Sequence, residues 1–110
     1  MAQKGVTEMS KSRVSLQEKL EELLGSREVY YQPPTSVKLS YPAIIYTRNR
    51  IQNRHANNEV YGQNISYTVT VIDRNPDSDI VQKVSLLPMC AHDRHYAAEN
   101  LNHDVFTLYY

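Results

Sequence analysis

The first regular pattern along the chain is that of an amphipathic helix. Leucines recur at positions i, i+4, i+7 and i+8, which places them on one helical face: Leu16, Leu20, Leu23 and Leu24. Ser12 and Ser15 both qualify as the N-cap, and Gly25 supplies the C-terminal stop. Residues 1–11 lack such periodicity, so we expect them to form a flexible N-terminal arm.

Three later segments carry the apolar patterns of strands. Residues 28–31 predict a short strand that ends before Pro33 and Pro34, because proline lacks the N–H that a strand ladder needs. Residues 41–47 predict a second strand with apolar side chains on both faces. Residues 65–72 give the clearest signal, since large apolar residues alternate there with serine and threonine.

The second half of the chain repeats the order of helix and strand. Residues 75–78 form a turn signal, and Asp77 or Ser78 can cap a second helix that Pro88 closes. The apolar stripe of this helix consists of Ile80, Val81, Val84 and Leu87. Residues 105–110 predict a final strand.

This order of elements indicates the fold class. Helix, strands, helix and strands predict an α+β protein with a mostly antiparallel or mixed sheet flanked by two helices, both on one face. The 110 residues suffice for one hydrophobic core, so residues 1–110 are expected to form a single domain.

Charge and composition narrow the classes of function. The 12 basic and 12 acidic residues give zero net charge, which argues against direct nucleic-acid binding. No apolar run is long enough to span a membrane, and the N-terminal segment lacks a signal-peptide core. The single cysteine, Cys90, fits a reducing compartment, so we expect a cytoplasmic protein without a membrane partner.

The one basic cluster lies beyond the second predicted strand. Arg48 and Arg50 would share a face with Tyr46 if the strand stayed extended, and Arg54 follows. Such a cluster could hold a nucleic-acid backbone, form a solvated strand end, or pair with carboxylates of another subunit. Residues 53–58 contain no large apolar side chain and are expected to form an exposed connection.

A cysteine and three histidines lie within fourteen positions: Cys90, His92, His95 and His103. Their spacing matches no zinc pattern, so we expect surface histidines, a buried thiol and no metal or cofactor. A small metal-binding protein or enzyme that uses Cys90 with His92 and His95 remains the alternative from a different class.

Tyrosine is unusually frequent, with nine tyrosines and no tryptophan. A tyrosine ring is apolar while its hydroxyl needs water or a partner, which suits surfaces that become buried in a complex. Tyr109 and Tyr110 end the chain. Either the fold itself covers this terminal strand, or a second subunit does.

Four segments together resemble a known family. Residues 41–46, 67–78, 87–90 and 100–110 look like the small tail-terminator or tail-completion proteins of long-tailed bacteriophages and prophages, over about residues 14–110. The resemblance implies a sheet flanked by helices, which agrees with the predicted order of elements.

The resemblance also implies a structural role without catalysis. Such proteins form a ring, typically a hexamer, on the head-proximal end of the tail tube, stop tube polymerisation and present a surface to the head-side connector. The protein would be assembled in the cytoplasm of the bacterial host and end in the virion. Its partners would be itself, the tail tube protein and the connector. A head-side adaptor or stopper is the alternative within the same machinery.

The resemblance suggests where the contacts with other subunits or with the tube would lie. The basic segment is long and polar, Asp-Arg pairs could form ion pairs at the corners of a ring, and the terminal tyrosines could be covered by a neighbour. The candidate interface residues are Arg48, Arg50, Arg54, Asp73, Arg74, Asp93, Arg94, Tyr109 and Tyr110.

Overall fold

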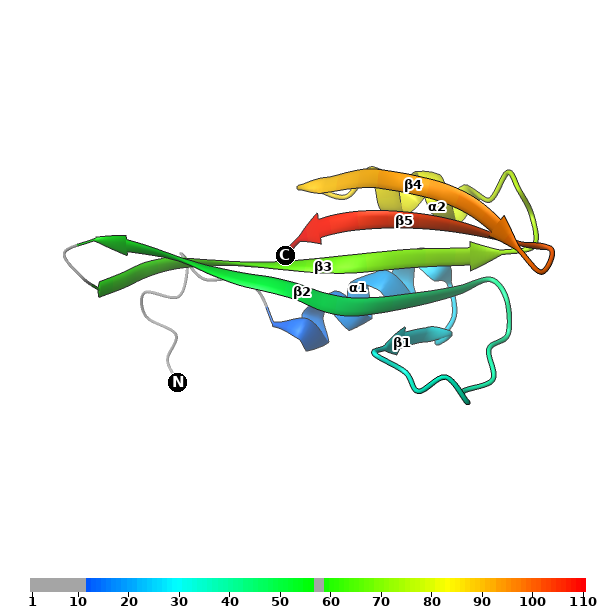
Figure 1. Cartoon of the computed structure of the whole chain (residues 1–110), viewed down its shortest axis with the longest axis horizontal. Coiled ribbons are helices and arrows are strands. Elements are labelled where there is room, and N and C mark those ends of the chain that lie inside the picture. Colours follow the sequence, from blue (N-terminus) through cyan, green and yellow to red (C-terminus); the bar gives the residue numbers. More distant parts are fainter. Residues whose placement is uncertain (1–11, 57–58) are drawn as a thin grey trace.

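A computed structural model describes residues 12–56 and 59–110 and shows an α+β fold. One sheet has the strand order β1-β2-β3-β5-β4, in which β1 and β2 are parallel and the other pairs are antiparallel (Figure 1). The predicted fold class is therefore confirmed. The elements are α1 (Arg13–Leu24), β1 (Val29–Tyr31), β2 (Ala43–Ala56), β3 (Glu59–Asp73), α2 (Asp79–Ser85), β4 (Cys90–Ala98) and β5 (Leu101–Tyr109).

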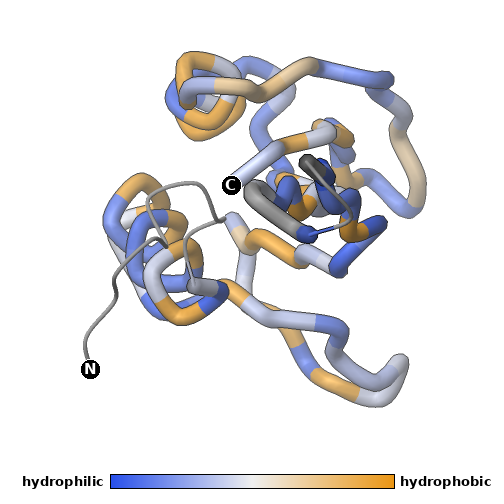
Figure 2. Tube along the Cα trace, turned by 90° about the vertical axis from the view of Figure 1, so that its left-hand side faces the viewer, coloured by the Kyte–Doolittle hydropathy of each residue, from blue (hydrophilic) through white to orange (hydrophobic). Residues whose placement is uncertain are grey.

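Both helices lie on the same face of the sheet, as a view along the long axis makes plain (Figure 2). The core forms between this face and the apolar sides of the helices. Leu16 and Leu20 of α1 and Val84 of α2 are fully buried there. The strands contribute the remaining core residues: Val29, Ile44, Tyr46, Tyr67, Val69, Val71, Phe106 and Leu108.

The helix ends resolve the alternatives that the sequence left open. Ser12 caps α1, because its Oγ accepts a hydrogen bond from the N–H of Ser15 at 3.1 Å. Gly25 ends α1 in the left-handed region, with φ of 80°. Ser78 caps α2 through its Oγ, and the helix ends at Ser85, before Pro88 is reached.

Tyr46 fastens β2 to α1 at the centre of the core. Its hydroxyl donates to Gln17 Oε1 at 2.5 Å and accepts from Arg13 Nη1 at 3.1 Å. Its ring lies 5.0 Å from Tyr31 and 5.9 Å from Tyr67, measured between centroids. Burial raises the pKa of Tyr46, although the Arg13 guanidinium opposes the shift.

The outer parts of β2, β3 and β5, and the whole of β4, differ from the expectation. Residues 53–56, expected to start an exposed connection, continue β2, and the remaining residues 57–58 of that expected connection lie outside the described part. β5 begins at Leu101 rather than at residue 105, and β4 was not predicted at all. These segments are polar or exposed and are held by backbone pairing, so burial imposes no apolar alternation on them.

Replacing Leu20 by Ala tests the packing of α1. We expect Leu20→Ala to lower the free energy of unfolding by about 2–5 kcal/mol, because it leaves a cavity in the core. Val14→Ala, in the same helix but at a 57% exposed position, should change it by less than about 0.5 kcal/mol. Urea denaturation followed by circular dichroism measures both, and equal effects would contradict the packing described.

Candidate assembly surfaces

β2 and β3 continue together beyond the rest of the sheet as a two-stranded arm, here residues 49–56 and 59–65. Pairing of β1 with β2 stops at Tyr46, and pairing of β5 with β3 stops at Ser66. In the part of the chain that the structure describes, no third strand pairs with the arm. It accounts for the elongated shape, 52 Å long against 27 and 26 Å (Figure 1).

The three arginines of the basic cluster lie at the base and along the arm, and all are exposed. Arg48 stands opposite Tyr67, on the side of the helices. A bulge between Arg48 and Arg50 then places Arg50 opposite Ser66, on the other face. The expectation that Arg48 and Arg50 share one face is therefore wrong.

Arg54 lies on the same face of the arm as Arg50. Arg54 stands opposite Gly62, and Arg50 stands opposite Ser66. Gly62 and Ser66 are four positions apart in β3, and residues an even number of positions apart share one face of a strand. A Cβ atom on Gly62 would come within 2.7 Å of Arg54 Nη2, so the missing side chain makes room for the guanidinium. The face of the arm away from the helices thus carries two cationic side chains, Arg50 and Arg54.

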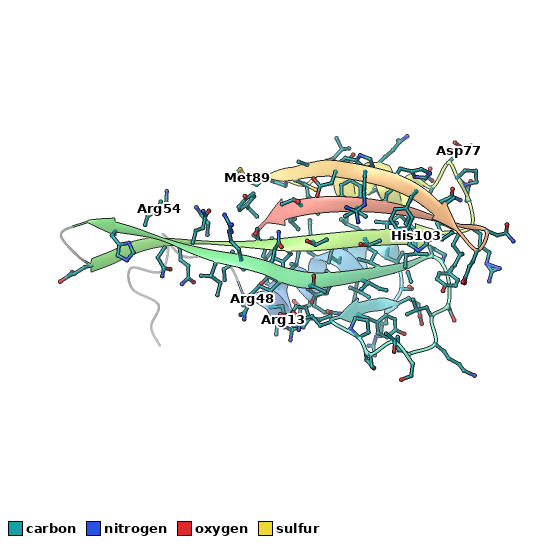
Figure 3. All side chains as sticks on the ribbon, viewed as in Figure 1. Arg13, Arg48, Arg54, Asp77, Met89 and His103 are labelled. Carbon is teal, nitrogen blue, oxygen red and sulfur yellow. The ribbon has the colours of Figure 1, made fainter. Side chains whose placement is uncertain are left out.

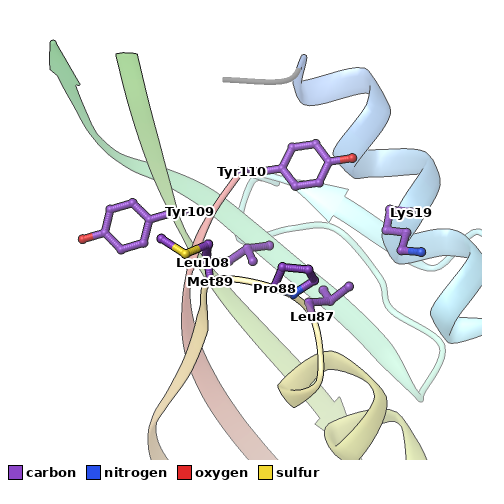
Figure 4. A pocket seen from close by; sticks show the side chains of 7 residues that line it. All are labelled: Lys19, Leu87, Pro88, Met89, Leu108, Tyr109 and Tyr110. Atoms are coloured by element: carbon purple, nitrogen blue, oxygen red, sulfur yellow. The ribbon is translucent and has the colours of Figure 1, made fainter. Parts of the chain in front are cut away.

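A hollow of about 430 Å³ lies beside the C-terminus, between α1, the segment after α2 and β5 (Figure 4). Met89 and Tyr109 at its rim are 71% and 39% exposed. The residues that line this apolar notch are Lys19, Leu87, Pro88, Met89, Leu108, Tyr109 and Tyr110.

The two terminal tyrosines have different surroundings. The N–H of Tyr110 donates to the carbonyl of Ile65 at 3.1 Å, and its hydroxyl is 2.8 Å from Ser15 Oγ. The N–H of Tyr109 donates to the carbonyl of Met89 at 3.0 Å, while its side chain faces solvent. The fold therefore anchors Tyr110 and leaves the Tyr109 ring available on the surface.

The two Asp-Arg pairs lie in separate places. Asp73 accepts from the N–H of Asn75 in the turn after β3, and the Arg74 guanidinium lies 5.6 Å from the ring centroid of Tyr41. In the edge strand β4, Asp93 accepts from Thr107 Oγ1 at 2.6 Å, and Arg94 lies 5.7 Å from the ring of Tyr96. The fold does not bring the two pairs together.

Two of the histidines converge on one carboxylate, which the sequence analysis missed. His92 Nε2 and His95 Nδ1 are both 3.0 Å from Oδ1 of the largely buried Asp104. A bulge between His92 and Arg94 makes this possible, because it places His92 and His95 on the same face of β4 as their partners Phe106 and Asp104 on β5. Such an irregularity has no signal in the residue pattern.

His103 and Cys90 take no part in this cluster. His103 stacks on Tyr96 with centroids 4.6 Å apart. Burial raises the pKa of the Cys90 thiol, and the neighbouring Asp93 carboxylate adds to the shift. Across residues 12–56 and 59–110, no three His, Cys, Asp or Glu side chains are placed to hold a metal ion.

No protein-family model matches this chain, and no curated protein matches it significantly. No helix in the described part of the chain is both long and apolar enough to cross a bilayer. The similarity to tail terminators therefore stays a prediction.

The contrast between the terminal tyrosines can be measured. Tyr110→Ala should lower the free energy of unfolding by about 1–3 kcal/mol, because it removes a packed ring and a hydrogen bond. Tyr109→Ala should cost less than about 1 kcal/mol, since much of its ring is already in water. Urea denaturation compares them, and a larger loss for Tyr109→Ala would contradict the arrangement.

The Cys90 thiol should react slowly. Because its pKa is raised, less thiolate is present at a given pH, and thiolate is the form that attacks alkylating reagents. We expect iodoacetamide at pH 8 to modify Cys90 several-fold more slowly in the folded protein than in urea. Mass spectrometry follows the reaction, and faster modification of the folded protein would revive a nucleophilic role.

Proposed function

We propose that the protein is a structural virion subunit that caps the head-proximal end of a bacteriophage tail tube as a ring. The ring ends tube polymerisation and offers its other face to the head-side connector. The observation that carries this proposal is the projecting arm. The similarity of the sequence to tail-terminator proteins supplies the specific tube-capping role.

The arm supports an assembly role for a physical reason. A two-stranded ribbon is at best marginally stable in water by itself, because it buries little apolar surface. Here the inner halves of the strands are fixed in the core, while the arm extends from it with polar side chains. An arm of this kind gains most when another molecule covers it.

The rest of the surface agrees with a role in assembly rather than catalysis. Met89 and Tyr109 are exposed beside an apolar hollow, and exposed apolar patches often mark interaction sites. Of the groups that could serve as a nucleophile, the Cys90 thiol is poorly suited, because burial and the Asp93 carboxylate raise its pKa. An enzymatic function that uses the Cys90 thiolate therefore has less support.

Tube capping can be tested directly by electron microscopy. Tail tubes are assembled from purified tube protein with and without this protein, and their lengths and ends are recorded. We expect density on one end of each tube and shorter tubes as the protein concentration rises. Binding along the tube walls would contradict the proposal, and binding only to connector rings would identify a head-side adaptor or stopper.

Charge reversal on the arm and at its base tests whether the projecting arm contacts the tube. Arg48→Glu with Arg50→Glu should reduce the fraction of capped tubes about tenfold or more, because repulsion replaces attraction at the contact. Lys38→Glu with Lys83→Glu makes the same change of net charge at exposed positions of the body. This control should cap normally, and equal losses in both variants would refute a specific role for the arm.

A further inference from the structure

Building on the proposed ring assembly, we propose that the arm of one copy binds the opposite end of a second copy, head to tail. The contact surface on the first copy is the arm with the apolar notch at its base. The surface that receives it is the acidic end, defined as the turns after β3 and after β4. We include the residues that border the first of these turns, Asp73 at the end of β3 and Asp79 at the start of α2. The charged residues are then Asp73, Arg74, Asp77, Asp79 and Glu99.

The arm is the feature that calls for a partner. Beyond Tyr46 of β2 and Ser66 of β3, no third strand pairs with it in the described part of the chain, and Ile51 on it is 44% exposed. The apolar notch adjoins it directly, because Tyr109 pairs with Ser66 where the arm begins. A molecule seated against the arm would therefore also cover the rings and side chains at the notch.

Charge selects a second copy as that partner. The arm and its base carry three arginines, Arg48, Arg50 and Arg54, and one carboxylate, Glu59. The acidic end carries four carboxylates against one arginine. A neutral chain that separates its charges in this way is complementary to itself, which also disfavours nucleic acid as the occupant.

The two surfaces lie at opposite ends of the long axis. Figure 3 shows Arg54 on the arm at one end and Asp77 near the other, in a molecule 52 Å long. One copy therefore cannot bring its own acidic end to its arm. Since the two surfaces differ, the contact is heterologous, and repeating it gives a ring if the rotation closes and a filament if it does not.

The acidic end is held in shape by hydrogen bonds within the subunit. Asn102 Nδ2 donates to the carbonyls of Asp73 and Arg74, at 3.3 and 3.2 Å, and so joins the start of β5 to the turn after β3. Asn75 Oδ1 accepts from the N–H of Asp77 at 2.9 Å within that turn. The side chains of Asp77 and Glu99 stay exposed, so a neighbour's arginines can reach them.

A charge-swap experiment tests this contact. The arm variant carries Arg50→Glu and Arg54→Glu, and the end variant carries Asp77→Lys and Glu99→Lys. Sedimentation velocity at low and high salt should show wild-type self-association that weakens with salt. Each variant alone should associate about tenfold or more weakly, because like charges then meet at the contact.

Mixing the two variants provides the decisive measurement. In an equal mixture each reversed arm meets a reversed end of the other variant, so association should return to near the wild-type level. Lys38→Glu with Lys83→Glu should behave as the wild type does. Circular dichroism confirms that every variant is folded.

The outcomes separate this contact from the function on which it rests. A wild type that caps tubes but stays monomeric without them, or associating variants that match the wild type, would overturn the head-to-tail contact alone. Two folded, weakened variants without rescue in the mixture would overturn the pairing of these surfaces. Normal self-association with no tube capping would overturn the proposed function and leave the contact standing.

Discussion

The pairing of β2 with β3 is the constraint on which the rest of the molecule depends. Its inner half lies in the core, where Tyr46 and Val69 stand opposite each other and are fully buried. Its outer half has cross-strand pairing but little apolar burial to support it. One continuous ladder thus joins the buried core to a projecting segment that has little burial of its own.

The contacts around this ladder hold its inner half in place, whereas its outer half projects from the sheet. Tyr46 ties β2 to α1 through Gln17 and Arg13, and the C-terminal strand is fastened at Tyr110 by Ile65 and Ser15. A rigid body therefore holds the base of the arm in a defined direction. Such preorganisation lowers the entropic cost of any association through the arm.

Burial explains which parts of this structure were predictable from the sequence. The leucines of α1 and the alternating strand at residues 65–72 are set by contact with the core, and they were predicted correctly. The stop at Gly25, also predicted correctly, depends on its left-handed backbone instead. β4 and the arm are held by backbone pairing with little burial, so their residue patterns carry no strand signal. The bulges that turn Arg50 to the far face and bring His95 to Asp104 are likewise decided by the ladder alone.

Hydrogen-deuterium exchange of the arm tests most directly whether it is the assembly element. Backbone amides of residues 49–56 and 59–65 are compared between the free protein and the protein bound to tail tubes, with β3 residues 67–71 as the internal reference. If the arm is the contact, its amides exchange quickly in the free protein and become strongly protected on the tubes, while the reference stays protected in both. Equal exchange of the arm in the two states would contradict its role.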